Sequence, residues 1–281
     1  MREIDVARVA GALKELFVDM NVQILPDVKE ALDQAKAEEK SELGRAVLED
    51  LIRNASIASR ERIPLCQDCG LAVIFLEVGQ EVAFVGGSLK AAVNEGVRQA
   101  YGEGYLRKSV VTDPLFDRNN SGDNTPAIVH VDIVPGDGVR IAATAKGMGS
   151  ENMSALAMMK AADGPEGVVD FVVETVRRGG SNPCPPIVVG VGIGGNFETA
   201  PLLAKKALLR PLESPHGDER YGQLEREMLA RINALGIGPA GYGGTTTALA
   251  VHIETAPTHI AGMPVAVNIC CHACRHGEVR L

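Results

Sequence analysis

The chain has 281 residues, enough for one large domain or two small ones, and 46% of them are hydrophobic, as in a globular protein with a sizeable core. Its formal net charge of -8 argues against general binding of nucleic acid or of an anionic membrane surface. No apolar run approaches the roughly 20 residues that span a bilayer, and the N-terminus is not a basic segment followed by an apolar core, so we expect a cytoplasmic protein without a membrane segment.

The first sixty residues are predicted to be helical. Apolar side chains recur on one helical face over residues 3–18 and again over 43–51, on either side of a charged helix around residues 28–40. This region shows no constellation of reactive side chains. We therefore expect it to serve as scaffold or interface.

From residue 71 onward the pattern indicates alternating strands and helices. Strands are predicted at 71–78, 82–85, 187–191, 248–254 and 265–269, a hairpin at 127–134 and 139–145, and helices at 89–101, 164–178, 197–208 and 221–235. A glycine-rich turn at 146–152 is expected to lead into a helix from Ser154. Free amides at a helix N-terminus and the nearby Lys146 suit an anion, and a tight turn with a surface lysine is the alternative. The predicted fold is α/β, with mixed sheets, flanking helices and a helical N-terminal region. We expect one domain over 1–281, with 1–60 helical and 61–281 as the core.

Six cysteines are too few for a disulfide framework in a chain of this length, so in a reducing compartment they favour metal binding or chemistry. Four of them form two CxxC pairs, Cys66 with Cys69 and Cys271 with Cys274. Cys184 stands alone between prolines, in a loop that cannot be regular.

Several interpretations of these motifs remain open from spacing alone. Residues 190–195 satisfy GxGxxG between a predicted strand and helix, as in a nicotinamide-dependent oxidoreductase, but they lie late in the chain and lack a well-placed acidic partner. The CxxC pairs allow a four-cysteine zinc site in an interaction protein, or a thioredoxin-like redox pair. A further possibility takes Cys66, Cys184 and one cysteine of the final group as ligands of an iron-sulfur cluster with one open iron.

The residues around the cysteines resemble the class I fumarate hydratase and L-tartrate dehydratase family, specifically its alpha subunit or the N-terminal half of its fused form. The shared motifs occur in the family's order over nearly the whole chain: Cys66-Gln67-Asp68-Cys69-Gly70, Leu106-Arg107-Lys108-Ser109, Asn124-Thr125-Pro126, Lys146-Gly147-Met148-Gly149-Ser150-Glu151-Asn152, Cys184-Pro185-Pro186 before Gly192-Ile193-Gly194-Gly195, and Cys271-His272.

The resemblance implies a hydro-lyase, with reversible hydration of fumarate to malate as the leading activity, a place in the tricarboxylic acid cycle, and L-tartrate dehydration as the alternative. It implies a [4Fe-4S] cluster whose open iron binds a C4 dicarboxylate substrate. The implied cluster ligands are Cys66, Cys184 and Cys271, the implied substrate-binding groups are Gln67, Arg107 and the Gly149 backbone, and the implied acid groups are Asp68 and His259.

The chain departs from the family pattern at a few thiols. The family usually has threonine in place of Cys69, and Cys270 and Cys274 are additional thiols beside Cys271. The resemblance also implies that the general base and further basic substrate contacts come from a beta subunit, which this chain lacks. We therefore expect an alpha subunit that needs a beta subunit for activity, in an alpha2beta2 assembly.

Overall fold

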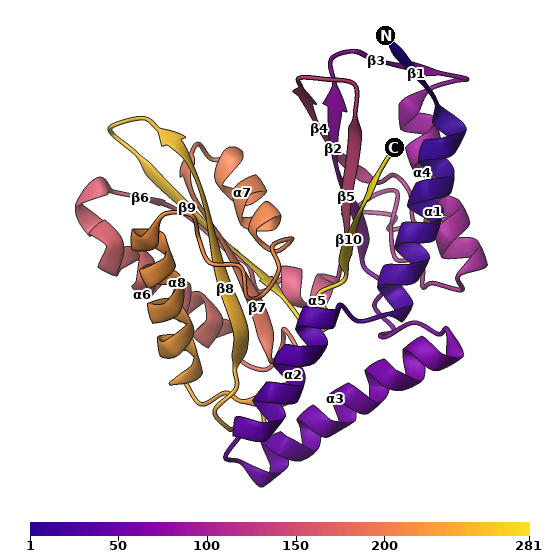
Figure 1. Ribbon diagram of the computed structural model, residues 1–281. Coiled ribbons are helices and arrows are strands. Elements are labelled where there is room, and N and C mark those ends of the chain that lie inside the picture. The colour runs from indigo at the N-terminus through magenta and orange to yellow at the C-terminus, as the bar shows by residue number, and fades with distance from the viewer. The chain divides into compact units, whose positions relative to one another are not determined.

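The computed structural model describes residues 1–281 and has a mixed α/β fold, which confirms the predicted class (Figure 1). Its helices are α1 (Val6–Val22), α2 (Pro26–Glu38), α3 (Glu42–Glu61), α4 (Leu89–Glu103), α5 (Met148–Glu151), α6 (Gly164–Gly179), α7 (Thr199–Ala207) and α8 (Glu219–Asn233), with short 3-10 turns η1 (Ala161–Asp163) and η2 (Pro239–Gly241). Its strands are β1 (Arg2–Asp5), β2 (Leu71–Gly79), β3 (Val82–Val85), β4 (Ile128–Val134), β5 (Val139–Lys146), β6 (Ala155–Met159), β7 (Ile187–Gly195), β8 (Ala248–Thr258), β9 (Met263–Cys270) and β10 (His276–Arg280).

The chain divides into two compact units, each assembled from segments far apart in sequence. The first unit comprises residues 1–25, 54–148 and 275–281, and the second comprises 26–53 and 149–274. The predicted helical N-terminal region is confirmed, with the short strand β1 ahead of it, and it is shared between the units. The single domain expected over 1–281 stays a prediction.

The first unit contains a four-stranded sheet in the order β10-β5-β2-β4 and a small parallel pair of β1 with β3. Helices α1 and α4 pack on one face of the larger sheet, and their apolar side chains join those of β2 and β5 in one core (Figure 1). The two helices approach closely because Gly96 of α4 has no side chain: a Cβ there would lie 2.5 Å from the Ala10 carbonyl oxygen. Cys69, in the loop that precedes β2, belongs to the same core.

The hairpin predicted from 127–134 and 139–145 is wrong, because β2 lies between the two strands. β4 pairs with β2 in parallel and β5 pairs with β2 antiparallel. The Pro135–Gly138 turn crosses the end of β2, where the Gly79 amide donates to the Gly138 carbonyl at 2.8 Å. The central β5 is almost fully buried, whereas β4 is a largely exposed edge strand.

The second unit contains a four-stranded sheet in the order β6-β9-β7-β8. Helices α6 and α8 cover one face, where valine and isoleucine side chains of β7, β8 and β9 form the main core. Helix α7 covers the other face through small residues, so that Ala200 and Ala204 pack against Ala266 (Figure 1).

The helix predicted from Ser154 is also wrong. Residues 155–159 form strand β6, which pairs antiparallel with β9. The Ser154 hydroxyl accepts hydrogen bonds from the Asn268 side chain at 2.9 Å and from the Ile269 amide at 3.1 Å, so it attaches this segment to β9 after the single turn of α5. Pairing with a buried strand outweighs the local helical pattern.

The glycines of the GxGxxG motif lie inside strand β7 and not in a strand-to-helix loop. A Cβ at Gly190 would lie 2.1 Å from the Ala204 carbonyl oxygen, and one at Gly192 would lie 2.0 Å from the Ala200 carbonyl oxygen. These glycines therefore let α7 pack directly on the sheet. The motif has a packing role, and the geometry does not support a dinucleotide-binding turn.

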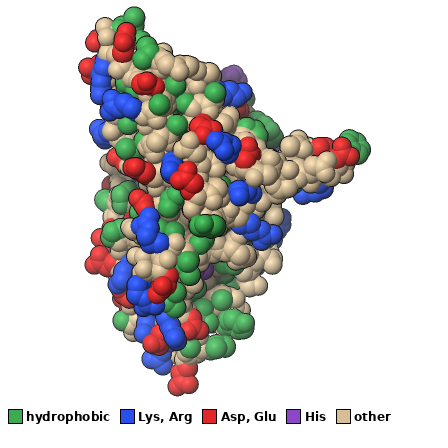
Figure 2. Space-filling view, turned by 90° about the vertical axis from the view of Figure 1, so that its right-hand side faces the viewer, with side chains coloured by type: hydrophobic (Ala, Val, Ile, Leu, Met, Phe, Trp, Pro, Cys, Tyr) green, Lys and Arg blue, Asp and Glu red, His purple; other side chains and the backbone are tan.

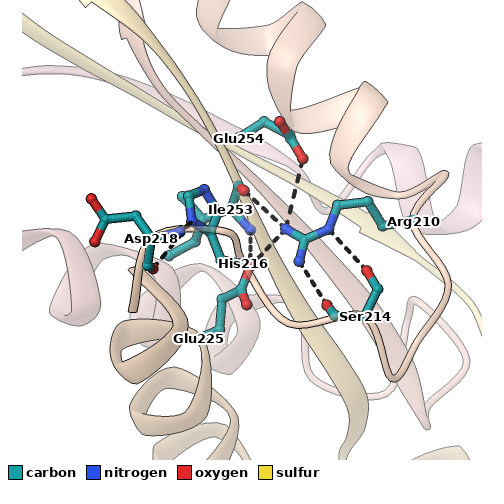
Figure 3. Close-up of polar contacts among 7 residues, drawn as sticks. All are labelled: Arg210, Ser214, His216, Asp218, Glu225, Ile253 and Glu254. Atoms are coloured by element: carbon teal, nitrogen blue, oxygen red, sulfur yellow. Dashed lines mark hydrogen bonds and ion pairs between the residues drawn. The ribbon is translucent and has the colours of Figure 1, made fainter. Parts of the chain in front are cut away.

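A buried ion pair holds the connection between α7 and α8 against β8 (Figure 3). Arg210 donates to the Glu225 carboxylate at 2.8 Å and to the Ile253 carbonyl at 3.1 Å, while the same carboxylate oxygen accepts the Ile253 amide at 2.8 Å. Arg210 also donates to the Ser214 carbonyl at 2.7 Å. Because each buried charge has partners, this cluster serves to fix the loop.

Charges of both signs are intermingled on the side where α1 and α4 lie (Figure 2), and no continuous basic surface is visible on that face. None of the helices combines the length and the apolar character that crossing a bilayer requires.

Candidate active site

The loop that carries Cys66 connects α3 to β2 in the first unit. It is attached to the C-terminal part of α1, because the Leu65 amide donates to the Asn21 carbonyl at 2.8 Å. The Cys66 thiol is partly exposed, and the Asp68 amide lies 3.4 Å from its sulfur as a hydrogen-bond donor. The Cys66 thiol also donates to the side-chain oxygen of Gln67 at 3.2 Å.

The carboxylate of Asp68 is fixed by two backbone amides. One oxygen accepts the Gly70 amide at 2.9 Å, and the other accepts the Met148 amide at 2.8 Å. The second bond ties the Cys66 loop to the glycine-rich turn after β5. Gly147 leaves room in this turn, because a Cβ there would lie 3.3 Å from the Asp68 carboxylate and 3.2 Å from the Arg275 guanidinium.

Arg275 is a buried residue of this site that the sequence reasoning missed. Its side chain is 3% exposed, and its guanidinium donates to the Asp68 carbonyl and, at 3.1 Å, to the side-chain oxygen of Asn21. Asn21 is itself fully buried and donates to the Phe17 carbonyl at 2.8 Å. An asparagine on the apolar face of a helix is the one signal in the sequence for this arrangement.

Gln67 and Arg107 both have exposed side chains in the first unit. The backbone amide of Arg107 donates to the Cys69 sulfur at 3.1 Å, so the arginine segment is bonded to the Cys66 loop. An exposed guanidinium on a fixed backbone can offer two parallel hydrogen bonds to a carboxylate. The predicted substrate-binding roles of Gln67 and Arg107 stay predictions.

Cys184 and Cys271 lie at the same edge of the sheet in the second unit. β7 and β9 are antiparallel with Val188 opposite Cys270, so the loop before β7 and the segment after β9 meet at this edge. The His272 ring nitrogen Nδ1 lies 3.1 Å from the Cys184 carbonyl oxygen, which bonds the two segments. The Cys184 thiol is exposed and that of Cys271 is partly exposed.

The remaining three cysteines are buried. Cys69, Cys270 and Cys274 are 1%, 5% and 2% exposed. Burial raises the pKa of the Cys69 thiol, and the Cys274 sulfur lies 3.9 Å from the Leu208 carbonyl oxygen. A buried thiol with a raised pKa is a poor metal ligand, so this arrangement disfavours a zinc site made of the two CxxC pairs.

The accessible thiols are thus the three that the sequence predicts as cluster ligands. Cys66 belongs to the first unit, and Cys184 and Cys271 belong to the second. No group of three or more His, Cys, Asp or Glu side chains in the structure is arranged to hold a metal ion. The set of three thiolate ligands stays a prediction.

Gly149, whose backbone is the third predicted substrate contact, lies in the single turn of α5. The turn is held within the second unit by Glu151, which accepts hydrogen bonds from Lys205 at 2.6 Å and from Asn268 at 2.9 Å. Asn268 lies three residues before Cys271, so this network orients the turn relative to the end of β9 that leads to the ligand.

The structure does not bring His259 to the cysteine edge of its own sheet. His259 is exposed in the turn between β8 and β9, where its Nδ1 accepts the Ala261 amide at 3.1 Å. Cys271 follows the opposite end of β9, which spans residues 263–270. At about 3.3 Å per residue, the two positions are roughly 20 Å apart.

Comparison with known proteins agrees with these features. The family model for fumarate hydratase (Fumerase) matches residues 10–280. A protein of Methanocaldococcus jannaschii named "Putative L(+)-tartrate dehydratase subunit alpha" is 43% identical over 279 residues, which cover 98% of each chain. L(+)-tartrate dehydratase subunit alpha of Shigella sonnei is 34% identical over 287 residues, covering 99% of this chain and 94% of the relative. An Escherichia coli subunit of the same name is 34% identical over 289 residues, covering 100% and 94%. The chain therefore belongs to the fumarate hydratase (Fumerase) family of hydro-lyases.

Proposed function

We propose that this chain is the alpha subunit of an iron-sulfur L(+)-tartrate dehydratase. The observation that carries the substrate assignment is the match, over nearly the full length, to chains named L(+)-tartrate dehydratase subunit alpha. The names of these relatives favour L(+)-tartrate dehydration over fumarate hydration, which is the leading activity expected from the sequence. Fumarate hydratase is the second candidate, because the matching family model carries that name.

The donor set fits a [4Fe-4S] cluster held by Cys66, Cys184 and Cys271. These three thiols are accessible, whereas the other three are buried, and the Asp68 amide is a hydrogen-bond donor 3.4 Å from the Cys66 sulfur. When bound, a cluster with one iron free of protein ligands supplies a Lewis acid for a hydroxyl and a carboxylate of the substrate. The same donor set gives no reason to invoke the thiols of Cys69, Cys270 and Cys274.

The chain's own residues would bind and orient a C4 dicarboxylate. Arg107 offers a bidentate contact to a carboxylate, Gln67 offers a neutral donor and acceptor, and the Gly149 backbone offers an amide. Asp68 is held by the Gly70 and Met148 amides, so its carboxyl group stays in one orientation to exchange a proton with the departing hydroxyl.

His259 can take part only from a second alpha chain, because its own chain places it at the far end of β9 from Cys271. This geometry supports an assembly with at least two alpha subunits. We propose an alpha2beta2 complex in which the beta subunit supplies the base and further basic contacts. A cytoplasmic location suits exposed thiols that must stay reduced.

The test is to purify the chain anaerobically with its beta subunit and to assay L(+)-tartrate dehydration and fumarate hydration. We expect about four irons and four sulfides per alpha chain and faster turnover of L(+)-tartrate. Serine variants of Cys66, Cys184 and Cys271 should each lose the iron, whereas serine variants of Cys270 and Cys274 should keep it. One zinc per chain without sulfide would refute the iron-sulfur cluster. Faster turnover of fumarate than of L(+)-tartrate would make fumarate hydratase the assigned activity.

A further inference from the structure

Two segments of the first unit carry predicted substrate groups, and buried side chains connect them. Gln67 lies in the loop 66–70, and Arg107 lies in residues 105–110, which form neither helix nor strand. Because the second segment belongs to no helix or strand, side-chain contacts and the buried Leu106 contribute to its position, together with one backbone bond from the Ser121 amide to the Val110 carbonyl at 2.8 Å.

The first connection is the thiol of Cys69. Its sulfur accepts the Arg107 amide at 3.1 Å and lies 3.6 Å from the Cys66 carbonyl oxygen, to which the thiol donates. The Cys69 backbone is also held, because the buried Tyr101 hydroxyl donates to its carbonyl at 2.6 Å. One small side chain thus links the arginine backbone to the ligand loop.

The second connection is the carboxamide of Asn124, which is fully buried. Its oxygen accepts the Ser109 amide at 2.7 Å and the Val110 amide at 3.2 Å, and its nitrogen donates to the Gly70 carbonyl at 3.2 Å. Asn124 adopts a left-handed backbone with φ of 62°, which asparagine tolerates better than most residues. The side chain therefore bridges the end of the ligand loop to the residues just after Arg107.

We propose that Cys69 and Asn124 are positioning residues that fix Arg107 relative to Gln67 for recognition of a substrate carboxylate. The proposal rests on the proposed function in one respect, the assignment of Arg107 as the residue that binds a substrate carboxylate. Two-point recognition by a guanidinium requires a defined backbone, and a displacement near 1 Å is enough to weaken it strongly. Neither residue needs to touch the substrate.

Two matched pairs of variants test the connections in the full chain. The hydroxyl of Cys69→Thr can still accept and donate a hydrogen bond. Cys69→Val has nearly the same shape as the threonine variant but can neither accept nor donate one. Asn124→Asp keeps the acceptor for the Ser109 and Val110 amides but not the donor to the Gly70 carbonyl, whereas Asn124→Gly removes both and still accepts the left-handed backbone. The second pair decides the question if Cys69→Val does not fold.

The first measurement is amide hydrogen exchange of residues 106–110 in the full chain, which does not depend on activity. We expect exchange to accelerate about tenfold in Cys69→Val and Asn124→Gly, the size that one lost hydrogen bond supports, and to stay near wild type in Cys69→Thr and Asn124→Asp. Equal exchange within both matched pairs would overturn the proposal.

The second measurement is the kinetics of the complex with the beta subunit. We expect KM for L(+)-tartrate to rise about tenfold in Cys69→Val and Asn124→Gly, with kcat less affected and iron per chain unchanged. Accelerated exchange with an unchanged KM would overturn the role in substrate binding. A wild-type complex that turns over neither L(+)-tartrate nor fumarate would refute the proposed function instead, and the exchange result would still decide whether the two side chains hold the segment.

Discussion

Glu39 provides a quantitative test of how α2 is held within the second unit. Its side chain is 2% exposed just after α2, and its carboxylate accepts the amides of Ser41 at 3.0 Å, Thr245 at 2.8 Å and Thr246 at 2.9 Å. Gly244 has a φ of 139°, and a Cβ there would lie 2.8 Å from a Glu39 carboxylate oxygen. The buried carboxylate therefore joins α2 to the loop before β8.

Burial alone would raise the pKa of Glu39, but the amides of Ser41, Thr245 and Thr246 outweigh it and lower the pKa from 4.5 to about 2. Because the folded pKa lies below the unfolded one, the stabilisation is complete above pH 4.5 and is lost as the pH falls toward 2. A fall in pKa of this size corresponds to roughly 3 kcal/mol of unfolding free energy at neutral pH.

Glu39→Gln should therefore lower the free energy of unfolding by about 3 kcal/mol at pH 7, since an amide nitrogen would face a backbone donor. The difference in unfolding free energy between Glu39→Gln and wild type should become smaller by roughly 2 kcal/mol when the pH is lowered from 7 to 3. Urea unfolding of the chelator-treated chain measures both values, with Glu38→Gln as the control, because Glu38 is exposed on the last turn of α2. A difference that does not change with pH would refute the assigned role of the carboxylate.

Further predictions concern substrate binding, sheet packing and subunit exchange. Arg107→Lys should raise KM for the dicarboxylate about tenfold with iron content unchanged, because lysine cannot form the bidentate contact; steady-state kinetics and iron analysis check this. Gly192→Ala should destabilise the chain by about 3 kcal/mol in urea unfolding relative to Gly262→Ala, whose Cβ would meet nothing within 4 Å. Asp68→Asn and His259→Asn alpha chains, each inactive alone, should regain activity when mixed, because one site of a mixed dimer keeps both residues; no recovery would contradict a shared site.

Local patterns in the sequence predict most helices and strands of this fold, whereas strand order depends on contacts between distant residues. The Pro135–Gly138 turn suits a hairpin locally, but the largely apolar β2 takes the central place between β4 and β5. Residues 155–159 likewise become a strand only because β9 is available as a partner. Such pairings cannot be derived from periodicity, since they are decided by which strand buries both faces.

In the candidate site, too, local motifs are visible in the sequence, whereas contacts between distant residues are not. The motifs around Cys66, Cys184 and Cys271 are visible as sequence, and the structure adds that these are the accessible thiols. The spacing of Cys69 suggests a ligand, whereas its burial and its bond to the Arg107 amide indicate a structural role. Nothing in the local sequence could reveal this bond, because 38 residues separate its partners.

Arg275, in the C-terminal segment, holds the loop that carries the predicted cluster ligand Cys66. It lies four positions after Cys271, yet it belongs to the first unit, where its guanidinium donates to the Asp68 carbonyl and to the Asn21 side chain. Lysine at this position cannot reproduce two diverging donors on a planar group, so Arg275→Lys should loosen the Cys66 loop. We expect it to lose iron faster than wild type under a chelator, with Arg280→Lys as the exposed control. Equal iron loss in the two variants would show that the ligand loop does not depend on this arginine. A faster loss would mean that the C-terminal segment of the first unit, which begins at Arg275, holds the loop of Cys66 in place.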